Sequence, residues 1–359
     1  MLDGLQKFFK YSVIFGLMPY VEDNKNNHRK LQQQKIYSLA LLLVTALFGI
    51  SGIIIRPLID IVVSNLVSVF VFLAQILAMS IIIIEAMSTL KQQERFYTKA
   101  KKIELLFWRQ LQQRFCARSQ NRYLLRKYGL ISLFTSGCLI GALLLTTVKF
   151  YDGYFCYAFP SVLIIRVRCI QLSIFADVIR FYQEGLNWKL TAIWSCKVRQ
   201  QRQFLDVNYP MLESLEQLML LKGLYRDIAE LSQIWHACFG WSAFAIVVVF
   251  FLDITVNSYW SFLTLSNIYA FYFIFLTMLT LVALLCLLLM LCFTCQMCDR
   301  AVSFNEFSLQ IVDNPIEFSA VGFFKISLRL LTAICSSLVT HMVILLQFRI
   351  TDIQLQQSF

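Results

Sequence analysis

Four hydrogen-bonding side chains share one face of the last hydrophobic segment, residues 330–348, which reads LLTAICSSLVTHMVILLQF. As a helix this segment rises roughly 28 Å, close to the thickness of a bilayer core. Ser336, Thr340 and Gln347 then fall within about 80° of Thr332 around the helix axis. Contact with lipid does not explain why these four hydrogen-bonding side chains lie on one face. Two interpretations remain open: hydrogen bonding to a neighbouring helix, and the lining of a water-filled pore.

Two arginines, Arg166 and Arg168, lie near the middle of another hydrophobic segment, residues 157–179. Each costs about 2.5 to 3.5 kcal/mol at the centre of a membrane helix, so an intramembrane arginine is a candidate functional residue. Two positions correspond to about 200° of rotation, so the two side chains cannot face one cavity in the same way. We expect one of them to face a ligand cavity or a polar partner such as Gln171. A structural ion pair or hydrogen bond to a neighbouring helix is the alternative.

Aromatic residues crowd the ends of two further hydrophobic segments, at Tyr259, Trp260, Phe262, Tyr269, Phe271, Tyr272 and Phe273. A belt at the membrane interface explains most of them. Aromatic rings also line pockets for small molecules, so Tyr269 and Tyr272 are candidate ligand-binding residues.

Catalytic, metal and cofactor chemistry are not indicated. The chain has three histidines, no Gly-x-Ser-x-Gly, no P-loop and no His-Glu-x-x-His. Cys292, Cys295 and Cys298 recur every three residues, but cysteine is commonly a buried apolar residue and no histidine is near them, so we do not expect a metal site. The sequence therefore predicts neither an enzyme nor a bound cofactor.

The composition is that of a membrane protein. Of the 359 residues, 58% are hydrophobic and 15% aromatic, and the mean hydropathy is +0.66. The net charge of +11 does not indicate nucleic-acid binding, because the basic residues lie between long apolar segments, where they act as topology signals. Such basic segments are also attracted to the anionic lipid of the inner leaflet.

Seven apolar segments are long enough to cross a bilayer, which predicts an all-α protein with seven transmembrane helices. We divide the chain into a cytoplasmic N-terminus (1–35), spans one and two (36–84), a helical cytoplasmic extension (85–127), spans three and four (128–179), a second such extension (180–233), spans five and six (234–298), a cytoplasmic segment leading into span seven (299–329), span seven (330–348) and an extracellular tail (349–359). Residues 85–127 contain neither Gly nor Pro, which favours continuous helix.

The distribution of Lys and Arg sets the orientation. With the division above, 27 of the 32 basic residues fall in the segments assigned to the cytoplasm, and three (Arg56, Lys149 and Arg349) in the short outer connections between spans and the extracellular tail. The positive-inside rule then predicts a cytoplasmic N-terminus and an extracellular C-terminus. A G-protein-coupled receptor has the opposite orientation, and no Asp-Arg-Tyr follows the third span. A transporter of a small solute is a second alternative, although no inverted repeat or pair of broken helices is visible.

The end of the last span carries a resemblance to a known family. Thr340 and His341, then five apolar residues, then Gln347 and Phe348 resemble the closing signature of insect gustatory receptors, which are related to insect odorant receptors: Thr-Tyr, five hydrophobic residues, Gln-Phe. His341 departs from this pattern.

The resemblance implies a contact chemoreceptor in the plasma membrane of chemosensory neurons, acting as a ligand-gated, non-selective cation channel. It implies a homo- or hetero-tetramer with related receptors, in which the last helix surrounds the pore. Thr332, Ser336, Thr340, Gln347 and Phe348 are then the pore or gate residues. The pocket for a small-molecule tastant, such as a bitter compound, would lie in the outer half of the bundle.

Overall fold

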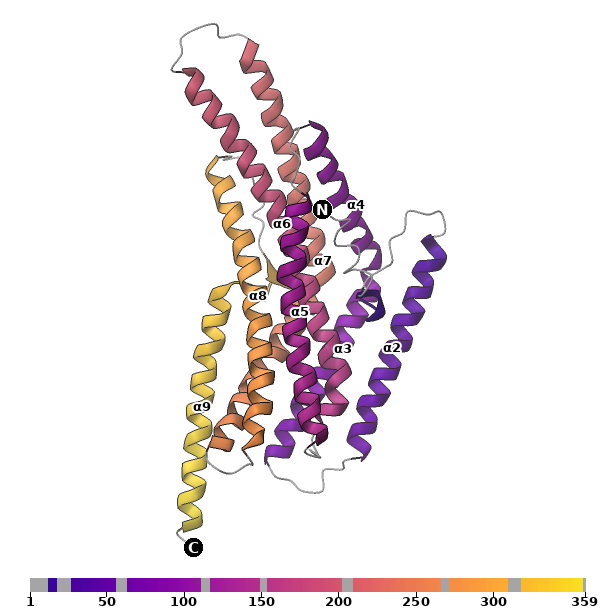
Figure 1. Cartoon of the computed structure of the whole chain (residues 1–359), viewed down its shortest axis with the longest axis vertical. Coiled ribbons are helices and arrows are strands. Elements are labelled where there is room, and N and C mark those ends of the chain that lie inside the picture. Colours follow the sequence, from indigo (N-terminus) through magenta and orange to yellow (C-terminus); the bar gives the residue numbers. More distant parts are fainter. Residues whose placement is uncertain are drawn as a thin grey trace.

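The computed structural model describes residues 12–17, 27–55, 63–110, 117–148, 154–201, 209–265, 271–308 and 318–357. These form a bundle of helices with one two-stranded sheet (Figure 1). The elements are α2 (Asn27–Ile55), α3 (Val63–Ser88), α4 (Leu90–Gln110), α5 (Ala117–Val148), α6 (Phe155–Gln201), α7 (Tyr209–Leu265), α8 (Tyr272–Ser308), β1 (Ser319–Ala320), β2 (Phe324–Lys325) and α9 (Leu328–Gln357). The predicted all-α class is confirmed.

Helix α6 is the central helix of the bundle. It packs against α2, α3, α5, α7 and α8, and every residue of 168–183 is buried. An enclosed helix can hold polar residues that a lipid-facing helix cannot, because its neighbours supply hydrogen-bond partners. This explains how α6 holds two arginines within an apolar segment.

Within the described residues, five helices are long and apolar enough to cross a membrane by length and composition: α2, α3, α5, α7 and α8. A shorter apolar stretch, Leu328–Ile344, lies in α9. Helix α6 is not among these five. The arrangement of seven spans, and the orientation of the termini, therefore stay predictions.

Helices α6 and α7 are much longer than a bilayer is thick. Their 47 and 57 residues rise roughly 70 and 85 Å, and they extend together beyond the other helices (Figure 1). Wherever the structure describes them, the segments 85–127 and 180–233 are helical except for a turn at Thr89, between α3 and α4. Their position in the cytoplasm stays a prediction.

A short hairpin, β1 and β2, precedes α9 and joins it to α7 and α8. Phe318, just before β1, is fully buried with its ring 4.8 Å from that of Trp235 on α7. The turn holds Val321 at φ 52° and Gly322 at φ 77°, a region that glycine adopts freely and valine rarely does. The backbone N–H of Leu328 then donates to Gln296 Oε1 on α8 at 3.1 Å, which fixes the start of α9. This hairpin, within residues 299–329, was not predicted from the sequence.

Candidate functional site

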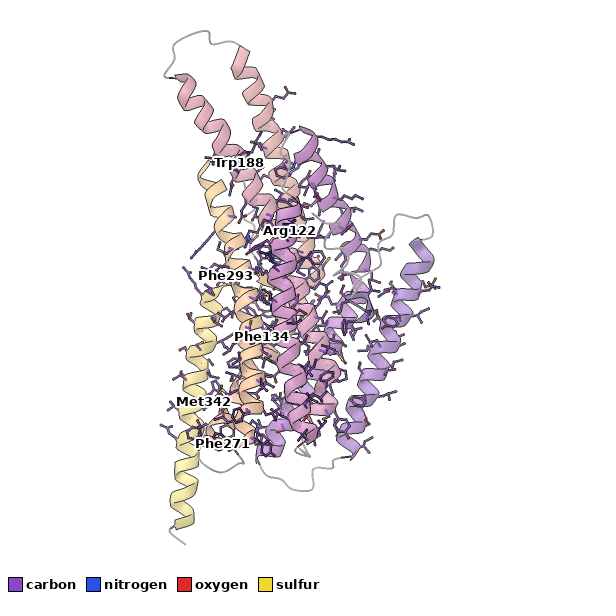
Figure 2. All side chains as sticks on the ribbon, viewed as in Figure 1. Arg122, Phe134, Trp188, Phe271, Phe293 and Met342 are labelled. Carbon is purple, nitrogen blue, oxygen red and sulfur yellow. The ribbon has the colours of Figure 1, made fainter. Side chains whose placement is uncertain are left out.

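A cavity of about 140 Å³ lies between α3, α6, α7 and α8. It is near the end of the bundle marked by Phe271, opposite the end marked by Arg122 and Trp188 (Figure 2). Its aromatic walls are Phe72, Tyr154, Phe155, Trp260 and Phe273. Its polar walls are Ser68, Gln75, Arg166, Asp253, Asn257, Thr277 and Thr280. An apolar pocket with a few converging polar groups is typical of a small-molecule site.

The polar wall is organised around Asp253 of α7. Nε2 of Gln75, on α3, donates to Oδ1 and Oδ2 of Asp253 at 2.9 and 3.0 Å. One turn later on α7, Asn257 Nδ2 donates to the backbone carbonyl of Asp253 at 2.7 Å. The hydroxyl of Thr280, on α8, donates to Asn257 Oδ1 at 2.8 Å. These bonds fix the positions of three helices around the cavity.

Arg166 lies in the wall of this cavity and is almost completely buried, with 4% of its surface exposed. One terminal guanidinium nitrogen, Nη1, donates to the backbone carbonyl of Thr135 on α5 at 2.9 Å. Its Nε has no hydrogen-bond partner among the described residues. Arg166 is thus the predicted arginine that faces a cavity.

Arg168 is not among the residues that line the cavity. It is fully buried, and its Nη2 lies 3.4 Å from Glu85 Oε2 on α3. Its other donors reach Ser242 Oγ at 3.1 Å, Gln171 Oε1 at 2.9 Å and the carbonyl of Cys238 at 3.1 Å. The structure therefore gives Arg168 the alternative role, a structural ion pair between helices.

Glu85, the partner of Arg168, is itself fully engaged. Its carboxylate accepts the backbone N–H groups of Trp241 and Ser242 at 2.8 and 2.9 Å, and the hydroxyl of Ser242. A buried ion pair is tolerated when such hydrogen bonds satisfy the remaining atoms. This pair connects α3, α6 and α7.

Of the two candidate tyrosines, Tyr272 is not among the residues that line the cavity. Tyr272 begins α8, and its ring centroid lies 5.6 Å from that of its neighbour Phe273, which does line the cavity. Tyr269 lies outside the described residues. Their predicted contact with ligand stays a prediction.

The polar face of α9 is exposed. Thr332, Ser336, Thr340 and Gln347 all lie on the outside of this single chain. The side chain of Phe348 lies outside the described residues. In Figure 1, α9 runs along the outside of the bundle and projects beyond its lower end.

The opposite face of α9 packs against α7 and α8. Ile334 is 7% exposed, and Leu338 packs against the main core. The ring of His341 lies 6.1 Å from that of Phe251 on α7, at an interplanar angle of 80°. His341 thus contacts a neighbouring helix.

With this geometry established, similarity to known proteins identifies the family. The profile of the 7tm chemosensory receptor family matches residues 5–303 and 299–352. The chain belongs to this family. It is a chemosensory receptor and a multi-pass membrane protein, which confirms the resemblance in its last helix.

Named relatives and solved structures agree with this family. This receptor is 27% identical to gustatory receptor 39b of Drosophila melanogaster, over 97% of this chain and 99% of the relative. It is 22% identical to gustatory receptor 2a of the same species, over 60% of each chain. Its fold is similar to that of the insect olfactory receptor OR5 from Machilis hrabei. The complex of OR5 with eugenol has a TM-score of 0.61 at 13% identity, over 97% of this chain and 98% of the other. A second structure of OR5 has a TM-score of 0.60 at 10% identity, over 97% of each chain.

Sequence reasoning did not find Gln75 and Asp253 of this receptor. Asp253 does carry a signal, because it is a lone carboxylate in the apolar stretch VVVFFLDITV, and an ionisable residue in a span is a candidate functional residue. Gln75 carries a weaker one, since an amide within a span needs a partner. Neither signal predicts that Gln75 and Asp253 are bonded to each other, because they lie on different helices.

Proposed function

We propose that this receptor is a subunit of a tetrameric, ligand-gated, non-selective cation channel that a small-molecule tastant opens. The observation that carries this proposal is the exposed polar face of α9. The hydroxyls of Thr332 and Thr340 donate to carbonyls of their own helix at 2.8 and 3.1 Å, yet a row of four polar side chains on one face gains nothing from contact with lipid. Four copies of α9 around one axis would instead place Thr332, Ser336, Thr340 and Gln347 along a water-filled path.

The similar proteins support the same function. One relative is named a gustatory receptor, and a structure of similar fold is an olfactory receptor in complex with eugenol. We infer that this chain likewise binds a small molecule, in the cavity that Arg166 and Asp253 line. We place it in the plasma membrane of chemosensory neurons, as a homo- or hetero-tetramer with related receptors. Phe348 would lie with Gln347 at the narrow outer end of the pore.

Helix α7 offers a physical connection between the cavity and α9. Asp253 lines the cavity, and Phe251, two residues earlier on the same helix, contacts His341 of α9. A ligand that binds the open arrangement more tightly than the closed one would shift the equilibrium toward opening. The shift can be no larger than that difference in affinity.

Expression in cells without other chemoreceptors tests the channel. The receptor, alone and together with a related gustatory receptor, is recorded at fixed voltage while small molecules are applied. We expect ligand-dependent cation currents whose rate per molecule greatly exceeds the turnover of a carrier. A signal at carrier rates would instead indicate a transporter, and a response that needs G proteins would indicate a coupled receptor. Either result contradicts the proposal.

A further inference from the structure

Most polar side chains in the cavity wall already have partners within the protein. Gln75 is bound to Asp253, and Thr280 is bound to Asn257. The hydroxyl of Thr277 accepts a hydrogen bond from Ser261 at 2.8 Å and donates to backbone carbonyls of its own helix. A ligand with many hydroxyl groups would lose its water and find few free partners here, which is unfavourable.

Arg166 is the exception. A guanidinium carries five N–H donors and no acceptor, and only Nη1 makes a hydrogen bond with the described residues, to Thr135. Nε makes none. Because Nε is enclosed by the protein, the terminal N–H groups that are not bonded to Thr135 are the donors left for a ligand, and they favour one with a hydrogen-bond acceptor.

The formal charges in the wall favour an uncharged ligand. The described wall contains one guanidinium, Arg166, and one carboxylate, Asp253. An anionic ligand would be attracted to Arg166 but repelled by the carboxylate of Asp253. A cationic ligand would be attracted to Asp253 but repelled by Arg166. Both would also lose hydration on entering a buried site. A neutral acceptor avoids this cost and still bonds to Arg166.

The volume and the aromatic walls limit the carbon skeleton. A cavity of about 150 Å³ holds benzene, and the volume here is about 140 Å³. Phe72, Trp260 and Phe273 supply ring surfaces, against which an aromatic ligand can pack edge-on or in an offset stack. One six-membered ring with a short substituent is therefore the upper limit for a ligand in this cavity.

We propose that the cavity takes an uncharged monocyclic aromatic compound with a carbonyl acceptor, and that Arg166 determines this specificity by donating to the carbonyl oxygen. This inference rests on the proposed function, because it names the chemical class of ligand for the same site.

Binding to purified full-length receptor in lipid nanodiscs tests the class of ligand without requiring a current. The probes are acetophenone, ethylbenzene, benzoate, benzylamine and glucose, with affinity measured from the ligand-dependent shift in unfolding temperature. Acetophenone and ethylbenzene share a ring and a two-carbon substituent but differ in the carbonyl. We expect acetophenone to bind roughly ten- to a hundredfold more tightly than ethylbenzene, as for a hydrogen bond to a charged group. The two ions and glucose should bind more weakly than acetophenone.

Arg166→Met keeps an unbranched, flexible side chain but shortens it and removes its donors. We expect it to lower the ratio of acetophenone to ethylbenzene affinity to about one. The matched control is Arg122→Met on α5, because Arg122 is exposed and lies at the other end of the bundle (Figure 2); its ratio should equal that of the wild type. An unchanged ratio in Arg166→Met would overturn the role of Arg166.

The wild-type measurement decides the ligand class even where a variant does not fold. No binding of acetophenone, or tighter binding of ethylbenzene, benzoate, benzylamine or glucose, overturns the proposal. The expected preference without current in any combination of subunits contradicts the channel but not the ligand class. Currents evoked by glucose without binding of acetophenone contradict the ligand class but not the channel.

Discussion

The amide nitrogen of Gln75 on α3 reaches both carboxylate oxygens of Asp253 on α7, at 2.9 and 3.0 Å. Both side chains are mostly buried and line the candidate ligand cavity. A buried carboxylate without a partner is costly, so this bond stabilises two walls of the cavity at once.

This pair should show energetic coupling. We expect Gln75→Leu and Asp253→Leu each to lower the free energy of unfolding by about 2 to 3 kcal/mol, because each leaves a buried polar group without its partner. The double variant should be more stable than the sum predicts, with a coupling of about 1 to 3 kcal/mol. The free energies of unfolding of the purified wild type, both single variants and the double variant give the coupling energy. Gln33→Leu, at an exposed position of α2, is the control and should change stability little. Strictly additive effects would contradict the coupling.

Arg166 and Arg168 should differ in what their loss affects. Arg168→Met leaves Glu85 as a buried charge without its cation, which costs about 3 to 5 kcal/mol. We therefore expect much less receptor at the cell surface. Arg166→Met removes donors from the cavity wall and should reach the surface in larger amounts, with a dose–response curve shifted by about tenfold or more. Surface labelling and current recordings on the same cells measure both. A wild-type amount of Arg168→Met at the cell surface, together with an unchanged dose–response curve for Arg166→Met, would contradict the roles given to the two arginines.

The comparison of these arginines shows what sequence reasoning can establish. Their spacing predicts that they point in different directions, because helix geometry is local. Which one meets the cavity depends on the position of α6 among its neighbours, and this is not encoded in any short segment. The hairpin before α9 was missed for another reason: strands of two residues have no periodic pattern to detect. The apolar helices and the polar face of α9 could be predicted, since both follow from residue spacing alone.

The orientation in the membrane is open to a direct test. The excess of Lys and Arg in the segments assigned to the cytoplasm predicts an inner N-terminus and an outer C-terminus. Epitope tags at the two ends, probed with antibody before and after permeabilisation, measure it. We expect the C-terminal tag to be labelled on intact cells and the N-terminal tag only after permeabilisation. Labelling of the N-terminal tag on intact cells would contradict the orientation.

The last prediction separates a pore from helix packing at α9. Single cysteines at Thr332, Ser336, Thr340 and Gln347 should react with a water-soluble thiol reagent and reduce the current, because we place these side chains along the conduction path. Cysteine at Leu338 is the matched control, since this residue lies on the same helix but packs against the core. Native Cys335 is exposed, so the scan uses a Cys335→Ser background.

Two further variants of α9 sharpen the result. Gln347→Ala removes an amide from the proposed narrow end of the pore, and we expect altered permeation or basal leak. His341→Tyr restores the residue of the gustatory receptor signature at a site that contacts Phe251, and we expect it to be tolerated because tyrosine can keep an aromatic contact with that ring. If every cysteine on the polar face is unreactive in channels that still conduct, these side chains bond to neighbouring helices and the pore lies elsewhere. Reaction at Leu338 together with the polar positions would instead show that α9 is loosely packed, which contradicts a lining made by one face.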